Sequence, residues 1–189
     1  MIEINNRTDM LIIVDPQNDF IDGSLAVLHA EEIIPVLNKY IEKIPQKAVS
    51  RDWHPKGHSS FKDQDGPWPD HCVQNTWGAE FHKDLNVDKR VTLINKGSEL
   101  DTDAYSAFDG TGLDIIVQGS GIKRLFIGGL ATDYCVKATV LDALKINGVK
   151  VYLLTDAIKA VKVNPGDGIA AMEEMFEAGA VPLVFAEIK

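Results

Sequence analysis

The chain has few cysteines, no surplus of basic residues and no long apolar run, and each absence excludes a class of protein. Its two cysteines, Cys72 and Cys135, are too few for a disulfide framework, so we expect a cytoplasmic protein with reduced thiols. No apolar stretch is long enough to cross a bilayer, and the first ten residues lack the basic and then apolar pattern of a secretory signal. With 28 acidic against 19 basic residues, the net charge of −9 disfavours nucleic acid as a partner. We therefore expect neither a membrane nor a nucleic acid to be its partner.

The remaining composition is that of a globular protein with one sizeable core. Of the 189 residues, 45% are hydrophobic and 25% are charged, and no linker divides the chain. Short apolar runs predict strands at residues 10–14, 47–50, 91–95, 125–127, 149–154 and 181–185. Helical spacing of apolar residues predicts helices at residues 30–44, 111–120, 135–147 and 167–178. The alternation predicts an α/β fold, a single domain over residues 1–189 with a six-stranded, mostly parallel sheet in a three-layer arrangement.

The stretch RLFIGGLATDYCV, residues 124–136, joins a buried strand to a helix through two glycines that allow close backbone approach. Thr132 or Asp133 is expected to cap this helix, which places Cys135 on its first turn. The N–H groups and positive dipole of a helix start favour a thiolate, so Cys135 is a candidate nucleophile. The alternative at this point is that Cys135 is a small buried apolar residue, as most free cysteines are.

Reactive side chains follow four successive predicted strands. Asp15 follows the first strand, Asp52 and His54 the second, Lys96 the third and Cys135 the fourth. Ligands of open α/β sheets bind beyond the carboxyl ends of the strands, so these side chains are expected to meet. Asp15 is the candidate base for the thiol of Cys135, and Lys96 would hold both by its charge.

A second group of polar residues lies in the long segment 51–90, which is rich in Gly, Pro, His, Asp and Trp and contains four of the five histidines. Asp52 and His54 are two positions apart, so on an extended chain they point the same way. His71 comes from the far side of the segment, and two imidazoles with a carboxylate suit zinc, iron or manganese. His58 is a candidate fourth ligand.

In combination these motifs resemble the nicotinamidases and pyrazinamidases of the isochorismatase-like cysteine hydrolases, which have a Rossmann-type fold. The resemblance covers nearly the whole chain and rests on IIVDPQNDF with GSLAV, RDWHPKGHSSF, WPDHCVQNTWGAEFH, KG with DAYSAF, and GGLATDYCV. It implies a catalytic triad of Asp15, Lys96 and Cys135. The peptide bond between Leu130 and Ala131 is then expected to be cis, with the N–H groups of Ala131 and Cys135 as the oxyanion hole.

The resemblance also assigns the binding residues. It implies metal ligation by Asp52, His54 and His71, with His58 near the metal in some members. The aromatic ring of the substrate is expected to lie against four residues that would otherwise be taken as ordinary core: Phe20, Leu25, Trp68 and Tyr105. Cys72, which adjoins His71, is interpreted as structural.

The expected function is hydrolysis of nicotinamide, and of pyrazinamide, to the carboxylic acid and ammonia through a thioester on Cys135. One divalent metal ion per chain, zinc with iron or manganese as alternatives, would hold the substrate ring, and the partner would be a small aromatic amide. One alternative is an isochorismatase-like hydrolase acting on another small amide or carbamoyl substrate. Another is a non-catalytic metal-binding relative, and the sequence leaves open whether the chain forms a homo-oligomer.

Overall fold

The computed structural model describes residues 1–88 and 90–189, and in this part of the chain six strands form one sheet. The strand order is β3-β2-β1-β4-β5-β6, and every neighbouring pair is parallel. The strands are β1 (Asp9–Val14), β2 (Gln46–Asp52), β3 (Thr92–Lys96), β4 (Arg124–Leu130), β5 (Lys150–Lys159) and β6 (Val181–Leu183). The α/β fold with a six-stranded parallel sheet is thus confirmed.

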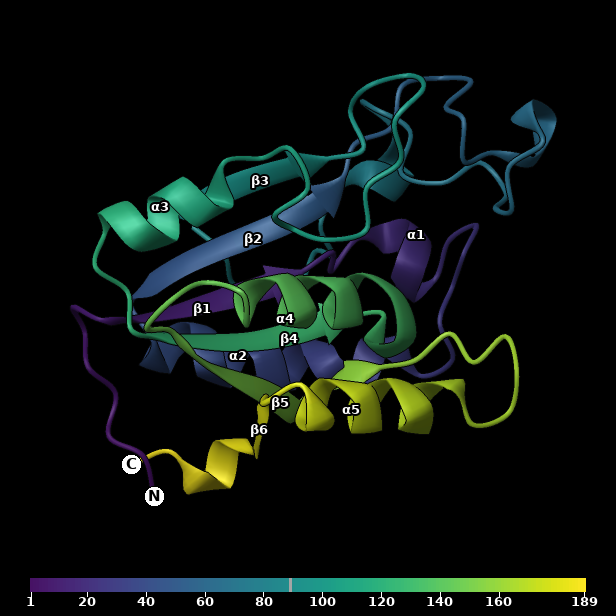
Figure 1. Cartoon of the computed structure of the whole chain (residues 1–189). Coiled ribbons are helices and arrows are strands. Elements are labelled where there is room, and N and C mark those ends of the chain that lie inside the picture. Colours follow the sequence, from purple (N-terminus) through teal and green to yellow (C-terminus); the bar gives the residue numbers. More distant parts are fainter. Residues whose placement is uncertain (89) are drawn as a thin grey trace.

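Helices cover both faces of the sheet (Figure 1). They are α1 (Asn18–Ile21), α2 (Ile33–Lys43), α3 (Leu113–Gly119), α4 (Lys137–Ala143) and α5 (Asp167–Glu177). Successive strand residues point to opposite faces, so Leu11 and Ile13 pack in one core with α2. Ile12 and Val14 pack in the other core with α3, α4 and α5. The strands read as continuous apolar runs because both faces are covered.

The ends of several elements differ from the sequence-based ranges. β4 continues through both glycines to Leu130, and β5 continues to Lys159, beyond its predicted end at residue 154. The helix predicted at residues 135–147 begins earlier, as a π-helical turn at Thr132–Val136, and its α-helical part ends at Ala143. Apolar patterning identified the elements, but the backbone hydrogen bonds that decide their ends leave little trace in the sequence.

The strand order reverses direction between β1 and β4, which is where open α/β sheets bind ligands. Gly129 has a φ of 127°, and a Cβ atom there would lie 2.1 Å from the carbonyl oxygen of Val14. Only glycine allows β4 to approach β1 this closely, which agrees with the close backbone approach predicted from the two glycines. The residues that follow β1 and β4 are thereby brought together.

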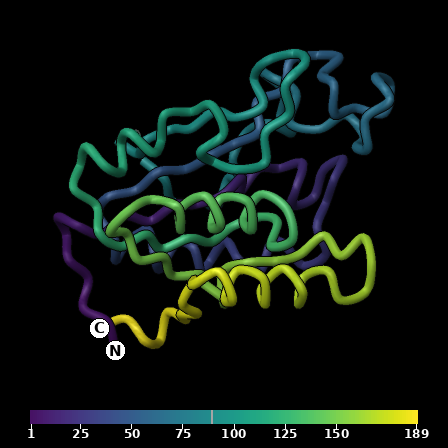
Figure 2. The backbone as a smooth tube through the Cα atoms, in the orientation of Figure 1, coloured from purple at the N-terminus to yellow at the C-terminus, as the bar shows by residue number. Residues whose placement is uncertain are grey.

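The long segment between β2 and β3 lies beyond the carboxyl ends of the strands (Figure 1). Isolated bridges pair His54 with Val73 and Phe61 with Trp68, so the segment folds back on itself. The two chain termini lie side by side at the opposite end of the sheet, where Ile2 pairs with Ile188 (Figure 2). Among the described helices, none combines the length and the apolar content needed to cross a membrane.

Candidate active site

Lys96 is the charged centre of the site. It is the last residue of β3, and its side chain is completely buried. Its Nζ atom lies 2.9 Å from Oδ2 of Asp15 and 3.3 Å from Sγ of Cys135, and it lies 2.5 Å from Oδ1 of Asp52. It also donates to the carbonyl oxygen of Ala104 at 3.2 Å. Burial alone would lower the pKa of Lys96, but the carboxylates of Asp15 and Asp52 raise it well above its usual value, so this ammonium stays charged.

Asp15 lies directly after β1, with a left-handed φ of 47°. The hydroxyl of Ser50 donates to its Oδ1 atom at 2.7 Å. Among the described residues, Oδ2 accepts no well-aligned hydrogen bond, so its contact with Lys96 is ionic. One carboxylate oxygen of Asp15 lies within 4.8 Å of Sγ of Cys135. Burial raises the pKa of Asp15 against the opposing charge of Lys96, which makes this carboxylate a better proton acceptor.

The prediction that Thr132 or Asp133 caps the helix after β4 is wrong. The residue before the π-helical turn is Ala131, and no side chain caps the turn. Asp133 instead accepts hydrogen bonds from the backbone N–H groups of Val161 and Lys162, each at 2.9 Å. Its carboxylate therefore fixes the segment that follows β5, a partner 28 positions away that local spacing could not reveal.

The expectation that the surroundings of Cys135 favour its thiolate is also corrected. Burial raises the pKa of the Cys135 thiol well above its usual value. Lys96 acts in the opposite direction, whereas the negative charges of Asp15 and Asp52 raise the pKa further. The burial of the thiol thus leaves a role for a base, and Asp15 is within reach to act as one.

A second polar cluster adjoins this triad. One ligand atom from each of Asp52, His54 and His71 lies within 4.8 Å of the other two. The Nε2 atoms of His54 and His71 lie 3.6 and 3.9 Å from Oδ2 of Asp52. Two imidazole nitrogens and a carboxylate oxygen are a donor set that divalent zinc, iron or manganese accepts. The three residues thus form a candidate site for a divalent metal ion.

Backbone carbonyl groups orient both imidazoles. The Nδ1 atom of His54 lies 2.8 Å from the carbonyl oxygen of Gly97, and Nδ1 of His71 lies 2.8 Å from that of Pro69. Donation through Nδ1 leaves the lone pair of Nε2 free for a metal. Gly97 has a φ of 58°, and a Cβ atom there would lie 2.5 Å from the His54 ring. Glycine at this position is therefore part of the support of the site.

His58 lies outside this trio, but one of its ligand atoms lies within 4.8 Å of ligand atoms of His54 and Asp103, and its role as a fourth ligand stays a prediction. Its ring stacks on that of His54 at a centroid distance of 4.1 Å. Its Nδ1 atom lies 2.8 Å from Oγ of Ser60, and its Nε2 atom lies 3.2 Å from the carbonyl oxygen of Thr102. Both nitrogens are thus engaged elsewhere, and His58 packs behind His54.

A small pocket opens onto Cys135 and the metal cluster. It is lined by side chains of both groups and by an aromatic and aliphatic wall: Phe20, Leu25, Asp52, Trp68, His71, Tyr105, Ala131, Tyr134, Cys135 and Val161. Trp68 donates its ring N–H to the hydroxyl of Tyr105 at 3.1 Å, which fixes one side of the wall. All four residues expected to hold the ring line this pocket. Its aromatic and aliphatic wall is of the kind that packs against the faces of an aromatic ring.

Sequence reasoning missed two residues of the wall. Tyr134 stands next to Cys135, and its ring lies 5.0 Å from that of Trp68 in an edge-to-face contact. Its place beside the nucleophile could have singled it out. Val161 follows β5, and no sequence motif marks it as a pocket residue. Its backbone N–H donates to the carboxylate of Asp133.

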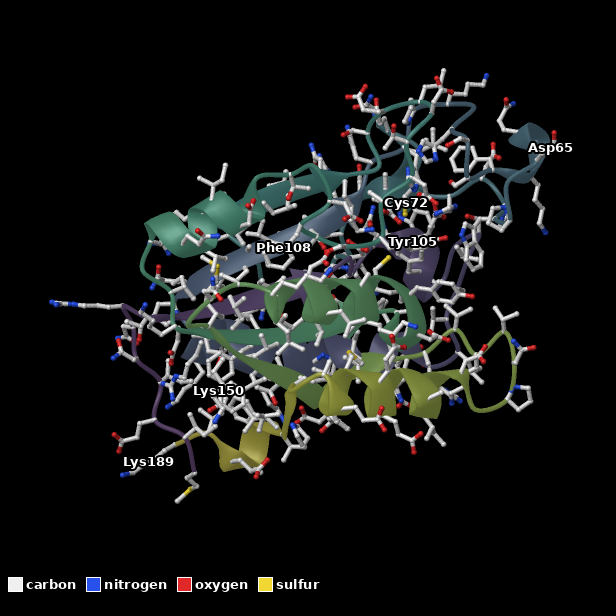
Figure 3. The ribbon with its side chains drawn as sticks, in the orientation of Figure 1. Asp65, Cys72, Tyr105, Phe108, Lys150 and Lys189 are labelled. Carbon is white, nitrogen blue, oxygen red and sulfur yellow. The ribbon has the colours of Figure 1, made fainter. Side chains whose placement is uncertain are left out.

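Cys72 lies outside the wall of the pocket. It is fully buried, its backbone N–H donates to the carboxylate of Asp19, and burial raises the pKa of its thiol. Figure 3 labels Cys72 and Tyr105 at the end of the sheet that holds the site. The peptide bond between Leu130 and Ala131 is cis, as the resemblance implies.

Comparison with known proteins agrees with this geometry. The family model of the isochorismatase domain matches residues 9–187. The nicotinamidase of Escherichia coli K12 is 38% identical to the chain, and the match covers 94% of this chain and 95% of that protein. The pyrazinamidase of Pyrococcus horikoshii, solved in complex with zinc, is 47% identical with a TM-score of 0.89, covering 94% of this chain and 99% of that one. PnC1 from L. infantum, solved in complex with nicotinate, is 36% identical with a TM-score of 0.93, covering 100% and 98%. The chain belongs to the isochorismatase-domain family.

Proposed function

We propose that the protein is an amidohydrolase that converts nicotinamide, and pyrazinamide, to the carboxylic acid and ammonia. One observation carries the proposal: Lys96 contacts both Asp15 and Cys135, and Cys135 lines a pocket with an aromatic and aliphatic wall. A buried thiol beside a carboxylate that can accept its proton is equipped for nucleophilic attack on a carbonyl carbon. The likeness to nicotinamidases and to a pyrazinamidase supports nicotinamide and pyrazinamide as substrates.

In this proposal Asp15 accepts the proton of the Cys135 thiol as sulfur attacks the carboxamide carbon. Asp15 then delivers that proton to the leaving nitrogen, and ammonia departs as the C–N bond breaks. Water attacks the resulting thioester, which releases the carboxylic acid and restores the thiol. Lys96 keeps its charge throughout, because two carboxylates raise its pKa, and it stabilises negative charge on Asp15 and on sulfur.

The tetrahedral oxyanion is assigned to the backbone N–H groups of Ala131 and Cys135. Both residues line the pocket and are buried, which strengthens a hydrogen bond to a developing negative charge. Backbone donors are fixed before the reaction, so they need no rearrangement as the charge develops.

The substrate ring would lie between the aromatic wall and the metal cluster, against Phe20, Leu25, Trp68 and Tyr105. Asp52, His54 and His71 would hold the metal ion, for which we propose zinc, supported by the donor set and by the zinc complex of the Pyrococcus horikoshii relative. When bound, the ion would supply a Lewis-acidic position for the ring nitrogen of the substrate. The two free, buried cysteines support our placing of the protein in the cytoplasm, where thiols stay reduced.

Ammonia release measured across a panel of small amides tests the function. Nicotinamide and pyrazinamide should be turned over, with nicotinate and pyrazinoate as products, and carbamoyl compounds such as N-carbamoylsarcosine should be poor substrates. Faster release from a carbamoyl compound would instead favour the alternative hydrolase. No ammonia from any amide, together with an unreactive Cys135 thiol, would favour the non-catalytic alternative.

A further inference from the structure

A buried glutamine outside the proposed triad and metal cluster binds the backbone of one candidate metal ligand. Gln17, two residues after Asp15, has no exposed surface. Its Nε2 atom donates to the carbonyl oxygen of Asp52 at 2.8 Å, and its Oε1 atom accepts the N–H of Asp52 at 2.8 Å. Nε2 also donates to the carbonyl oxygen of Ala79 at 3.1 Å. One side chain thus pairs with both backbone groups of Asp52.

The place of this contact explains its form. The ladder between β1 and β2 runs from the pair Met10 and Gln46 to the pair Ile13 and Val49. The N–H of Asp15 adds one more bond, to the carbonyl oxygen of Ser50, before the chain turns away. Beyond that point β1 no longer provides partners for the backbone N–H and carbonyl groups of Asp52. A side-chain amide offers the same donor and acceptor as a peptide group. Gln17 therefore extends the ladder by one residue with its side chain.

Asp52 needs this fixed position because its two oxygens face different groups. Oδ1 contacts Lys96, whereas Oδ2 lies between the Nε2 atoms of His54 and His71. A small rotation of the Asp52 backbone would move both oxygens at once. We propose that Gln17 is a positioning residue that sets the affinity of the Asp52, His54 and His71 cluster for a divalent metal ion. The inference rests on the proposed function only in taking Asp52 as a metal ligand.

Gln17→Glu is the sharpest variant, since glutamate has the same shape but an ionised carboxylate cannot donate. It retains an acceptor for the N–H of Asp52 but loses both bonds from Nε2, and it places an oxygen against the carbonyl of Asp52. Zinc affinity of the metal-stripped full chain, measured by competition with a chromogenic chelator, should fall about 10–100-fold, as for other groups that orient metal ligands. Asp52→Asn, which changes the ligand itself, should weaken zinc binding at least as much.

A matched control is Asn38 of α2, which belongs neither to the metal cluster nor to the lining of the pocket. Asn38 donates to the carbonyl oxygen of Asp84 at 2.8 Å and accepts the N–H of Asn86 at 2.8 Å, so its amide also bridges two backbone groups. Asn38→Asp makes the same amide-to-carboxylate change in an exposed setting. Zinc affinity should stay within about twofold of the unaltered chain, because no metal ligand depends on that bridge.

Thermal midpoints of the metal-free variants separate metal affinity from folding. If Gln17→Glu does not fold, Gln17→Met replaces it, since methionine fills the space without a hydrogen bond, and the same fall in affinity is expected. The proposal is overturned if a folded Gln17 variant binds zinc as tightly as the unaltered chain while Asp52→Asn binds it more weakly. It is also overturned if neither Gln17→Glu nor Gln17→Met folds, because Gln17 then supports the fold as a whole. If Asp52→Asn binds zinc normally, the metal site of the proposed function is at fault, and the inference fails with it.

Discussion

The ammonium of Lys96 lies 3.3 Å from Sγ of Cys135, although the two residues come from strands that are not neighbours. In the sheet β2 and β1 stand between β3 and β4, and parallel strands are about 4.8 Å apart. Lys96 passes the end of β2, where it contacts Asp52, and the end of β1, where it contacts Asp15, before it reaches the thiol. A long, flexible side chain with a compact charge is suited to this path, and the planar fork of arginine is not.

Lys96→Ala should abolish most activity and lower stability. It leaves the carboxylates of Asp15 and Asp52 buried without their cation, and breaking a buried pair costs about 3–5 kcal/mol. Turnover should fall on the order of 10²–10⁴-fold, measured as ammonia release from nicotinamide. Lys145→Ala is the control, since Lys145 is 76% exposed in its pair with Asp142 and should change neither quantity appreciably. Equal effects in the two variants would remove Lys96 from the mechanism.

Asp15→Asn should fold normally but lose turnover by roughly 10²–10⁴-fold. The amide keeps the shape of the carboxylate and can still accept the hydrogen bond from Ser50, but it cannot accept the thiol proton. A variant with near-normal ammonia release would show that another group deprotonates the thiol.

Removal of the metal should weaken substrate binding more than it affects the thiol. The ligands that we propose, Asp52, His54 and His71, do not include Cys135, so chelator-treated protein should still react with iodoacetamide at a similar rate. Nicotinamide should bind more weakly to it, and benzamide, which lacks the ring nitrogen, should be a much poorer substrate than nicotinamide for the untreated enzyme. Calorimetry with nicotinamide before and after chelation measures the effect. Unchanged binding would mean that the metal does not hold the ring.

Asp133→Ala should raise KM for nicotinamide more than it lowers kcat. Its carboxylate accepts hydrogen bonds from the N–H groups of Val161 and Lys162, and Val161 lines the pocket. Loss of two charge-assisted bonds should loosen this wall, at about 1.5–3 kcal/mol each. Asp133→Asn, which can still accept one hydrogen bond from this segment, should be intermediate between Asp133→Ala and the unaltered enzyme. A fall in kcat with KM unchanged would place Asp133 in the chemistry instead.

Apolar runs and the residues that follow them predicted much of this site. Asp15, Asp52, Lys96 and Cys135 each stand at or just beyond a strand end, and parallel strands carry their carboxyl ends to one edge. The order of the strands was not predicted, because it depends on pairings between distant segments. The reach of Lys96 across two strands follows from that order.

The errors also have physical causes. Asp133 was expected to cap a helix, because spacing reveals only local partners, and its partner lies 28 residues away. Cys135 was expected to carry a thiolate, but burial of the thiol and the nearby carboxylates outweigh the charge of Lys96. Ligation by His58 stays a prediction, since its nitrogens contact Ser60 and Thr102, which composition cannot reveal.

The central claim is that Cys135 forms a thioester with the acyl group of an aromatic amide. Acid quenching of the enzyme during turnover of nicotinamide, followed by mass spectrometry of its peptides, measures this directly. One nicotinoyl group should be found on the peptide that contains Cys135, in the unaltered enzyme and in Cys72→Ala, which should keep its activity. Cys135→Ala should carry no acyl group and release no ammonia. An acyl group on another residue, or undiminished ammonia release by Cys135→Ala, would contradict the account.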